Sequence, residues 1–218
     1  MAGFTMNKAL TWALIWFAGA ALASLSACSG GNNAATADAE QGALAGAAIG
    51  KPFTLTDQDG KPVRWDDFKG KYRIVYFGYT YCPDVCPVDL QRIMQAYALF
   101  AKQDPARAAK VQPMFITVDP ARDTPAVLKN YVTAFSPKLI GLTGTAEQIA
   151  KVTKDFAVVY AVEKTKGSTD YLVSHSRTPY LFGPDGEPMA LIPVDDPATP
   201  GDDGAPQAVL AALDHWVK

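Results

Sequence analysis

A buried strand that leads almost directly into an amphipathic helix, with two cysteines between them, limits most strongly what this chain can fold into. Residues 72–80 read YRIVYFGYT, a β-branched and aromatic run with no polar alternation, which predicts a strand buried on both faces. Residues 87–103 place apolar side chains three and four positions apart, which predicts an amphipathic helix. Cys82 and Cys86 therefore lie at a strand-to-helix junction.

The same alternation of strand and helix continues along the chain. Strands are predicted over 111–119 and 139–144, and helices over 123–135 and 145–156, with Thr145 as the cap of the last. Strands that alternate with helices imply parallel crossover connections. Further along, 178–193 predicts a hairpin that turns at 184–186, and 206–218 predicts a closing helix.

The start of this region has the pattern of a β-hairpin at the edge of a sheet. Two short alternating runs within 52–65 are joined by DQDGK, whose Asp59-Gly60 pair suits a tight turn. The whole pattern predicts an α/β fold, with a mixed sheet and helices on both faces. In such sheets the functional crevice lies beyond the carboxyl ends of the parallel strands, where Cys82 and Asp119 emerge.

The first part of the chain reads as a targeting segment. Residues 1–27 hold one charged side chain, Lys8, and an apolar stretch that is short for a membrane span, so a cleaved signal is favoured over an anchor. The segment LSAC resembles the lipobox of bacterial lipoproteins, which implies a lipid on Cys28; an ordinary cleavage site is the alternative. Small and polar residues in 28–48 predict a flexible tether, and 49–218 the folded domain.

These features predict an extracytoplasmic protein on the periplasmic side of a bacterium, attached to a membrane by its lipid. If Cys28 is acylated, Cys82 and Cys86 remain as an isolated pair of thiols. The formal net charge of -2 and the absence of a basic cluster argue against a nucleic-acid partner. We expect the soluble domain to be monomeric.

Three roles compete for the two thiols: a stabilising disulfide, a dithiol that exchanges electrons, and a pair of metal ligands. A domain of this size buries roughly 70% of its unfolded surface without a disulfide, so stabilisation is the poorest explanation. A helix N-terminus stabilises thiolates and lowers their pKa. Thiolates are soft ligands that suit Cu(I), and also Zn(II) when further ligands are available.

A third ligand must come from elsewhere in the chain, which contains only two histidines. His175 lies in a predicted loop between strands, whereas His215 lies in the closing helix beside Trp216. On position alone, an ordinary loop histidine is as good an interpretation of His175 as a metal ligand. Asp119 is the candidate for an acid that contacts a metal ligand without binding the metal itself. An aspartate before proline is, however, often only a turn residue.

Three segments of the chain resemble successive blocks of the Sco/SenC family. They are YFGYTYCPDVCP, ITVDPARDTP and YLVSHSRTPYLFGPDGE, in matching order across 49–218. The resemblance implies a thioredoxin-like three-layer sandwich and one copper ion, as Cu(I) or Cu(II), held by Cys82, Cys86 and His175. It also implies a role in cytochrome c oxidase assembly.

The resemblance makes a metallochaperone the leading hypothesis, with a copper-accepting subunit of a membrane oxidase as the partner. The alternative is a thiol-disulfide oxidoreductase that uses Cys82 and Cys86 as a redox-active disulfide to reduce extracytoplasmic targets, including the oxidase subunit. A peroxidase ranks third, because it needs an arginine beside the reactive sulfur, and only Arg122 or Arg177 could approach it in space. We therefore do not expect an enzyme beyond this redox alternative.

Two positions depart from the family pattern. Ser174 stands where the family usually has an aspartate before the histidine, which removes a carboxylate that could orient the imidazole. Pro179 precedes a predicted strand, where thioredoxins place a cis-proline facing the active-site sulfurs. The commoner alternative is a trans proline at the start of a strand.

Overall fold

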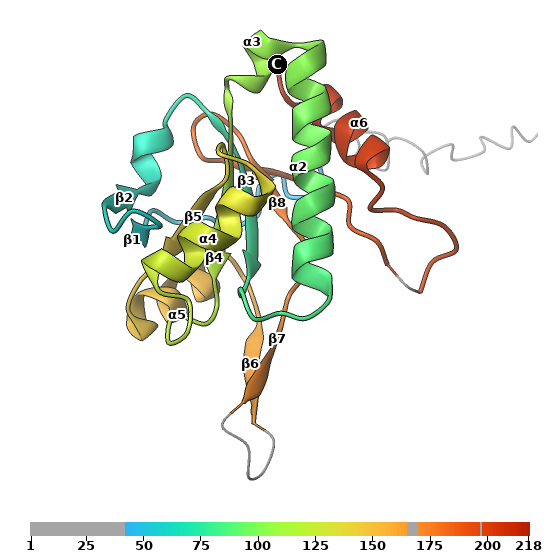
Figure 1. Cartoon of the computed structure of the whole chain (residues 1–218). Helices are drawn as coiled ribbons and strands as arrows, with labels where there is room; N and C mark the ends of the chain where they lie inside the picture. Colours follow the sequence, from blue (N-terminus) through green and yellow to red (C-terminus); the bar gives the residue numbers. More distant parts are fainter. Residues whose placement is uncertain (1–41, 165–169, 197) are drawn as a thin grey trace, which may run out of the picture.

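The computed structural model describes residues 42–164, 170–196 and 198–218. A seven-stranded sheet forms its centre, in the order β2-β1-β5-β4-β3-β8-β9 (Figure 1). Its strands are β1 (Thr54–Asp57), β2 (Pro62–Arg64), β3 (Tyr72–Gly78), β4 (Val111–Thr117), β5 (Ile140–Thr143), β8 (Tyr180–Phe182) and β9 (Pro188–Leu191). Pairing is parallel from β3 through β4 to β5 and antiparallel at both ends of the sheet, so the predicted mixed sheet is confirmed.

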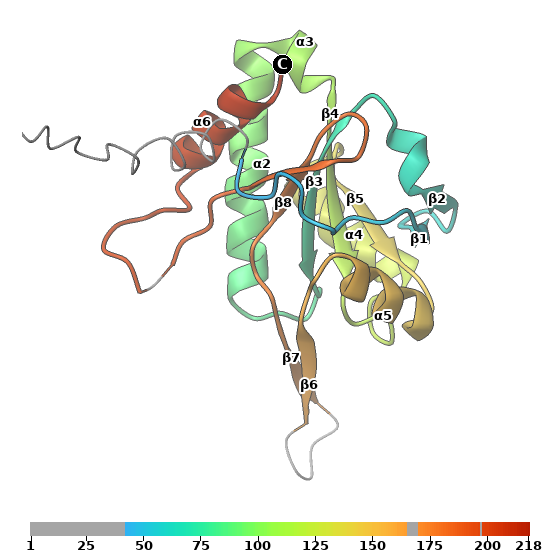
Figure 2. The ribbon, with the colours of Figure 1, turned by 180° about the vertical axis from the view of Figure 1, so that it is seen from behind.

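Helices cover both faces of this sheet. They are α2 (Val85–Gln103), α3 (Pro105–Ala108), α4 (Pro125–Phe135), α5 (Ala146–Asp155) and α6 (Pro206–Trp216), with a short 3-10 helix η1 (Trp65–Phe68). Two opposite views show α2 and α4 on one face and α5 on the other, with α6 beside α2 (Figures 1 and 2). The arrangement is the thioredoxin-like three-layer fold that the resemblance to the Sco/SenC family implies.

The central strand β3 shows why the predicted run at 72–80 has no polar alternation. The Tyr76 hydroxyl donates to the Asp89 carboxylate on α2, at 3.0 Å. The next residue, Phe77, packs on Phe156 at the end of α5, with ring centroids 5.5 Å apart. Successive side chains of a strand point to opposite faces, so both faces of β3 are buried under helices.

Local signals in the sequence also predict correctly where elements begin and turn. The β1–β2 hairpin lies at the edge of the sheet, and Gly60 in its turn has φ of 78°. Thr145 caps α5, and its hydroxyl accepts from the Gln148 backbone N–H while the Gln148 side chain accepts from the Thr145 N–H. This reciprocal pair satisfies two of the N–H groups that a helix start leaves free.

A separate two-stranded ribbon of β6 (Tyr160–Lys164) and β7 (Tyr171–His175) projects from the sheet (Figure 1). The sequence does not predict β6, and the placement of His175 in a loop is wrong, because this residue ends β7. Residues of β6 are largely exposed, so burial imposes no alternation of apolar and polar side chains by which a strand could be detected.

The predicted signal of 1–27 and the lipidated Cys28 lie outside the described residues. Part of the predicted tether is described, and there Leu44 packs on the core while its N–H donates to the Met189 carbonyl at 3.1 Å. Folded contacts therefore begin before residue 49. No helix in the described part of the chain is long and apolar enough to cross a membrane.

Candidate metal centre

The two cysteines occupy the junction between β3 and α2, as the sequence predicts. Cys82 precedes the first residue of the helix, Val85, and Cys86 lies in the first turn. The backbone N–H of Cys86 donates to the sulfur of Cys82, with N and Sγ 3.4 Å apart. Cys86 is fully buried, whereas Cys82 is half-buried and faces solvent on one side.

A glycine on β3 makes room for the buried sulfur. A Cβ atom at Gly78 would lie 2.9 Å from Cys86 Sγ and 2.9 Å from Cε2 of Phe115, which is closer than van der Waals contact allows. Because Gly78 has no side chain, the first turn of α2 can pack directly on the strand. The position of the Cys86 sulfur therefore depends on this residue.

His175 completes a group of three ligand atoms. Its Nε2 lies 3.1 Å from Cys86 Sγ, and one ligand atom from each of Cys82, Cys86 and His175 lies within 4.8 Å of the others. Its Nδ1 lies 2.9 Å from the Ser176 carbonyl oxygen, which can only accept a hydrogen bond. Nδ1 therefore carries the proton in the neutral ring, and the Nε2 lone pair faces the sulfurs.

Two tyrosines, one on β3 and one directly after it, pack against the imidazole ring. The rings of Tyr76 and Tyr79 meet the His175 ring edge to face, with centroid distances of 6.4 Å and 6.0 Å. Such contacts fix the orientation of the imidazole. A rigid imidazole loses little rotational freedom when it binds a ligand.

The electrostatics of the two sulfurs are opposite. The pKa of Cys82 is well below its ordinary value, chiefly because of its hydrogen bond with Cys86, with the backbone N–H groups of Asp84 and Cys86 adding to the effect. The pKa of Cys86 is raised, because it donates to the Cys82 sulfur and is buried. Of the two sulfurs, Cys82 is therefore the one that loses its proton more readily.

A buried ion pair fixes the chain directly after the histidine. Nε and Nη2 of Arg177 donate to the two carboxylate oxygens of Asp89, each at 2.7 Å, and Nη1 donates to the Asp195 carbonyl at 2.6 Å. Asp89 is one turn after Cys86 on α2 and is 1% exposed. These donors of Arg177 bind oxygen acceptors and none of them binds a sulfur. A peroxidase would instead require an arginine beside the reactive sulfur.

The contacts of Asp119 place it beside the ribbon. Its Oδ1 accepts from the Tyr171 hydroxyl at 2.8 Å and its Oδ2 from Arg122 Nε at 2.5 Å. Among the described residues, this carboxylate bonds neither to a cysteine nor to His175. Arg122, the other arginine considered for a peroxidase, is likewise engaged with Asp119.

Comparison with known proteins identifies the family of this chain. Residues 41–202 match the SCO1/SenC family. The chain belongs to that family. It is 45% identical over 152 residues to the mitochondrial protein SCO2 of Saccharomyces cerevisiae, an overlap of 69% of this chain and 49% of that protein. The chain spans about half the length of the first relatives it matches.

Solved structures of SCO1/SenC proteins share this fold. Bradyrhizobium japonicum ScoI with copper bound is 39% identical, with a TM-score of 0.66 over 78% of this chain and 100% of that one. A SCO1/SenC family lipoprotein from Bacillus anthracis is 27% identical, with a TM-score of 0.58 over 76% and 93%. The thioredoxin domain of a Bacteroides vulgatus thiol-disulfide oxidoreductase, 16% identical with a TM-score of 0.52 over 78% and 96%, shares the fold alone.

The structure shows the contacts of Ser174 and Pro179, the two residues that depart from the usual SCO1/SenC pattern. The Ser174 hydroxyl donates to the Ala161 carbonyl across the ribbon, at 3.4 Å. The Ser176 carbonyl, and not a side chain at 174, therefore orients the imidazole. Pro179 is buried directly before β8, and its carbonyl accepts from the Ile192 N–H at 2.9 Å.

Sequence reasoning missed two acids of this SCO1/SenC site, Asp89 and Asp123. Asp123 is fully buried and accepts from the backbone N–H and hydroxyl of Thr80, at 3.0 Å and 2.6 Å, and from the Thr117 hydroxyl at 2.6 Å. It fastens the loop that carries Cys82 to the end of β4. The only signal in the sequence is that Asp123 lies within the block ITVDPARDTP.

Cys82 and His175 open onto a hollow of about 310 Å³ beside the ribbon. It is lined by Tyr79, Cys82, Pro83, Asp84, Val85, Glu163, Leu172, Val173, Ser174, His175 and Arg177. This hollow gives an incoming group access to Cys82 and His175 together.

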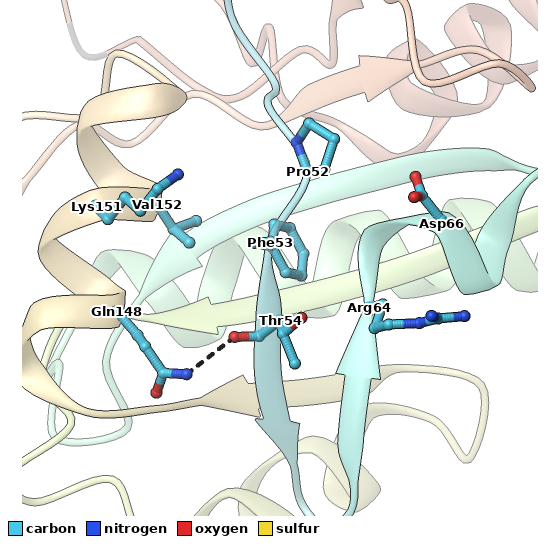
Figure 3. Close-up of a pocket in the computed structure, with 8 residues that line it drawn as sticks. All are labelled: Pro52, Phe53, Thr54, Arg64, Asp66, Gln148, Lys151 and Val152. Atoms are coloured by element: carbon cyan, nitrogen blue, oxygen red, sulfur yellow. Dashed lines mark hydrogen bonds between the residues drawn. The ribbon is translucent and has the colours of Figure 1, made fainter.

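A second hollow, of about 280 Å³, lies where β1 and η1 face α5 (Figure 3). It is lined by Pro52, Phe53, Thr54, Arg64, Asp66, Gln148, Lys151 and Val152. Gln148 spans it with a hydrogen bond from Nε2 to the Thr54 carbonyl at 3.1 Å (Figure 3). Its lining contains neither thiol nor imidazole, and its two cations pair with Asp67 and Asp155, so we place no metal there.

Proposed function

We propose that this protein binds one copper ion through Cys82, Cys86 and His175 and delivers it to the binuclear copper site of cytochrome c oxidase. The observation that carries the proposal is the convergence of two sulfurs and the His175 Nε2 lone pair within 4.8 Å. Two thiolates and a neutral imidazole form a soft donor set that suits copper. The copper held by the similar ScoI structure supports the same assignment.

The ligands differ in exposure, and this suits transfer by ligand exchange. Cys82 lines the hollow beside the ribbon, whereas Cys86 is fully buried. A cysteine or histidine of the accepting subunit can therefore enter next to Cys82 while Cys86 still holds the ion. No covalent bond of a substrate is broken, and the ion need not pass through solvent. A copper-carrying role in oxidase assembly fits this chemistry.

Titration of the reduced soluble domain with Cu(I) and Cu(II) tests the proposal. We expect one ion per chain, and we expect His175→Ala to weaken binding because it removes the nitrogen ligand. The matched control is His215→Ala, which removes the other histidine; His215 lies in α6 against Trp216, with ring centroids 4.4 Å apart. Equal copper binding by wild type and His175→Ala would contradict the assignment.

A second function, reduction of disulfides, is favoured by the electrostatics of the sulfurs. Cys82 has a lowered pKa and lies at a helix N-terminus, so its thiolate is available as a nucleophile. It would attack a target disulfide and release one target thiolate, leaving a mixed disulfide. Cys86 would then attack the sulfur of Cys82 and release the second thiolate, so that two electrons pass to the target.

Trapping the mixed disulfide tests this second function. A Cys86→Ser variant keeps the attacking thiolate but cannot resolve the intermediate, so it should accumulate an adduct with a disulfide-bonded peptide from an oxidase copper site. The adduct should disappear in Cys82→Ser. If neither the wild type nor Cys86→Ser reacts with such a peptide, the redox role is excluded for that target.

We also propose that a lipid on Cys28 holds the domain on the outer side of a bacterial membrane. The lipobox-like segment before Cys28 supports this, as does the similar lipoprotein from Bacillus anthracis. Mass spectrometry of the full-length protein from membranes should find acyl chains on its N-terminal cysteine. A Cys28→Ser variant should lack them and leave the membrane fraction. An unmodified N-terminus would refute the anchor.

A further inference from the structure

The ribbon that ends in His175 is fastened to the body of the domain by Arg122. This arginine follows β4, and its Nη1 donates to the backbone carbonyl of Tyr171 on β7 at 3.0 Å. Its Cζ also lies 3.6 Å from the centroid of the Tyr171 ring. Nη2 is buried without a partner among the described residues, so ring stacking holds that side of the guanidinium.

Asp119 forms hydrogen bonds with both of these residues, Arg122 and Tyr171. Its Oδ1 accepts from the Tyr171 hydroxyl at 2.8 Å, and its Oδ2 accepts from Arg122 Nε at 2.5 Å. Asp119 is only 4% exposed, so solvent screens these charge-assisted bonds little. Tyr171 is therefore held at its carbonyl, its ring and its hydroxyl. We call Asp119, Arg122 and Tyr171 the Arg122 clamp.

The clamp also touches the segment that leads to Cys82. Arg122 Cζ lies 4.8 Å from the Tyr81 ring centroid and 5.6 Å from that of Tyr79. Tyr79 in turn packs against the His175 ring, with ring centroids 6.0 Å apart. A single cation thus contacts both the loop of one sulfur ligand and the strand of the nitrogen ligand.

The ribbon depends on such contacts because it has no other strand to pair with in the described part of the chain. A two-stranded hairpin alone is marginally stable in water. Tyr171 lies four residues before His175 on the same strand, a span of about 13 Å of extended backbone. Movement at Tyr171 is therefore transmitted along β7 to the imidazole.

We propose that Arg122 is a positioning residue for His175: by clamping Tyr171 it keeps Nε2 beside the two sulfurs and so sets how long copper stays bound. This inference rests on the proposed copper function and adds the residue that controls the third ligand. Arg122 touches neither copper nor its ligand atoms. It acts through the ribbon.

The test compares copper release from wild type, Arg122→Lys and Tyr171→Phe after adding a strong chelator. Lysine keeps the charge beside Asp119 but loses the planar fork and the ring stack, and phenylalanine loses only the hydroxyl bond. We expect release to be about tenfold faster in each variant, which corresponds to roughly 1.4 kcal/mol. Electron paramagnetic resonance of the Cu(II) forms should also show weaker coupling to the imidazole nitrogen.

The matched control is Arg107→Lys at the opposite end of the molecule. Arg107 also stacks on a ring, with Cζ 5.0 Å from the Phe100 centroid, donates to the Asp214 carboxylate at 2.7 Å and donates to the Val217 carbonyl at 2.9 Å. It lies on α3, far from the ribbon (Figure 1). This variant should lose stability while releasing copper at the wild-type rate.

Amide exchange of the metal-free proteins separates this inference from the proposed function. Arg122→Lys should speed exchange in 160–164 and 171–175, and Arg107→Lys should not. If wild type binds copper through His175 but Arg122→Lys keeps its release rate and nitrogen coupling, the clamp is not a positioning device. If wild type binds no copper, the proposed function fails first, and the inference falls with it.

Discussion

Gly78→Ala tests whether the backbone of β3 sets the position of the Cys86 sulfur. The new Cβ would meet both Cys86 Sγ and Phe115 Cε2 at 2.9 Å, so each neighbour must move by about 0.6 Å to restore normal contact. Both residues are fully buried and cannot escape into solvent. Overpacking of this kind costs about 1–3 kcal/mol, offset by up to about 1 kcal/mol because alanine restricts the unfolded chain.

Gly141→Ala is the matched control for this substitution. A Cβ there would lie 2.9 Å from Val132 Cγ1, a clash of the same size between β5 and α4, with no cysteine involved. Both variants should lower the melting temperature of the reduced, metal-free domain by roughly 2–10 °C. Only Gly78→Ala should also weaken copper binding, by about tenfold, because it displaces the sulfur of a ligand.

Chemical unfolding and copper competition, measured on the same preparations, check this prediction. The reasoning is refuted if the two variants lose similar stability while Gly78→Ala binds copper as tightly as wild type. In that case the first turn of α2 would adjust without displacing the sulfur. Weaker copper binding in Gly141→Ala would also count against the reasoning. The loss of copper affinity would then follow from general destabilisation and not from a displaced sulfur.

Three further predictions concern the surroundings of the site. Because the pKa of Cys82 is lowered, its alkylation by iodoacetamide should stay nearly constant from about pH 8 to 6, whereas an ordinary thiol slows about tenfold per unit. Arg177→Ala leaves Asp89 buried without its cation and should cost about 3 kcal/mol in urea unfolding, against at most about 1 kcal/mol for the exposed Arg64→Ala. Asp123→Asn turns an acceptor of three donors into a partial donor and should cost about 1–3 kcal/mol, with faster amide exchange in the loop before α2 as the second readout.

Much of the fold is predictable from the sequence, because its signals are local. A run of apolar residues at 72–80 indicates a strand covered on both faces, and the apolar spacing at 87–103 indicates the helix that follows. Together they place both cysteines at the junction. Turn and cap residues such as Gly60 and Thr145 predict where elements turn and begin.

What could not be predicted depends on tertiary packing. Nothing near His175 in the sequence indicates that its Nε2 lies 3.1 Å from a sulfur 89 positions away. The resemblance to a family supplied that expectation, whereas the residue pattern around His175 placed it, wrongly, in a loop. The partners of Asp89 and Asp119 are likewise set by how helices and ribbon meet, so the patterns of charge along the chain did not reveal them.

The unequal exposure of the two sulfurs imposes an order on events at this centre. Cys86 has no contact with solvent, whereas Cys82 borders the hollow. An incoming ion would reach Cys82 before Cys86, because only Cys82 borders the hollow. An accepting group would likewise replace Cys82 at the ion while Cys86 still holds it from the buried side. Cys82 would thus be the first sulfur to gain the ion and the first to lose it, so loading and unloading would both take place on the solvent side of the centre.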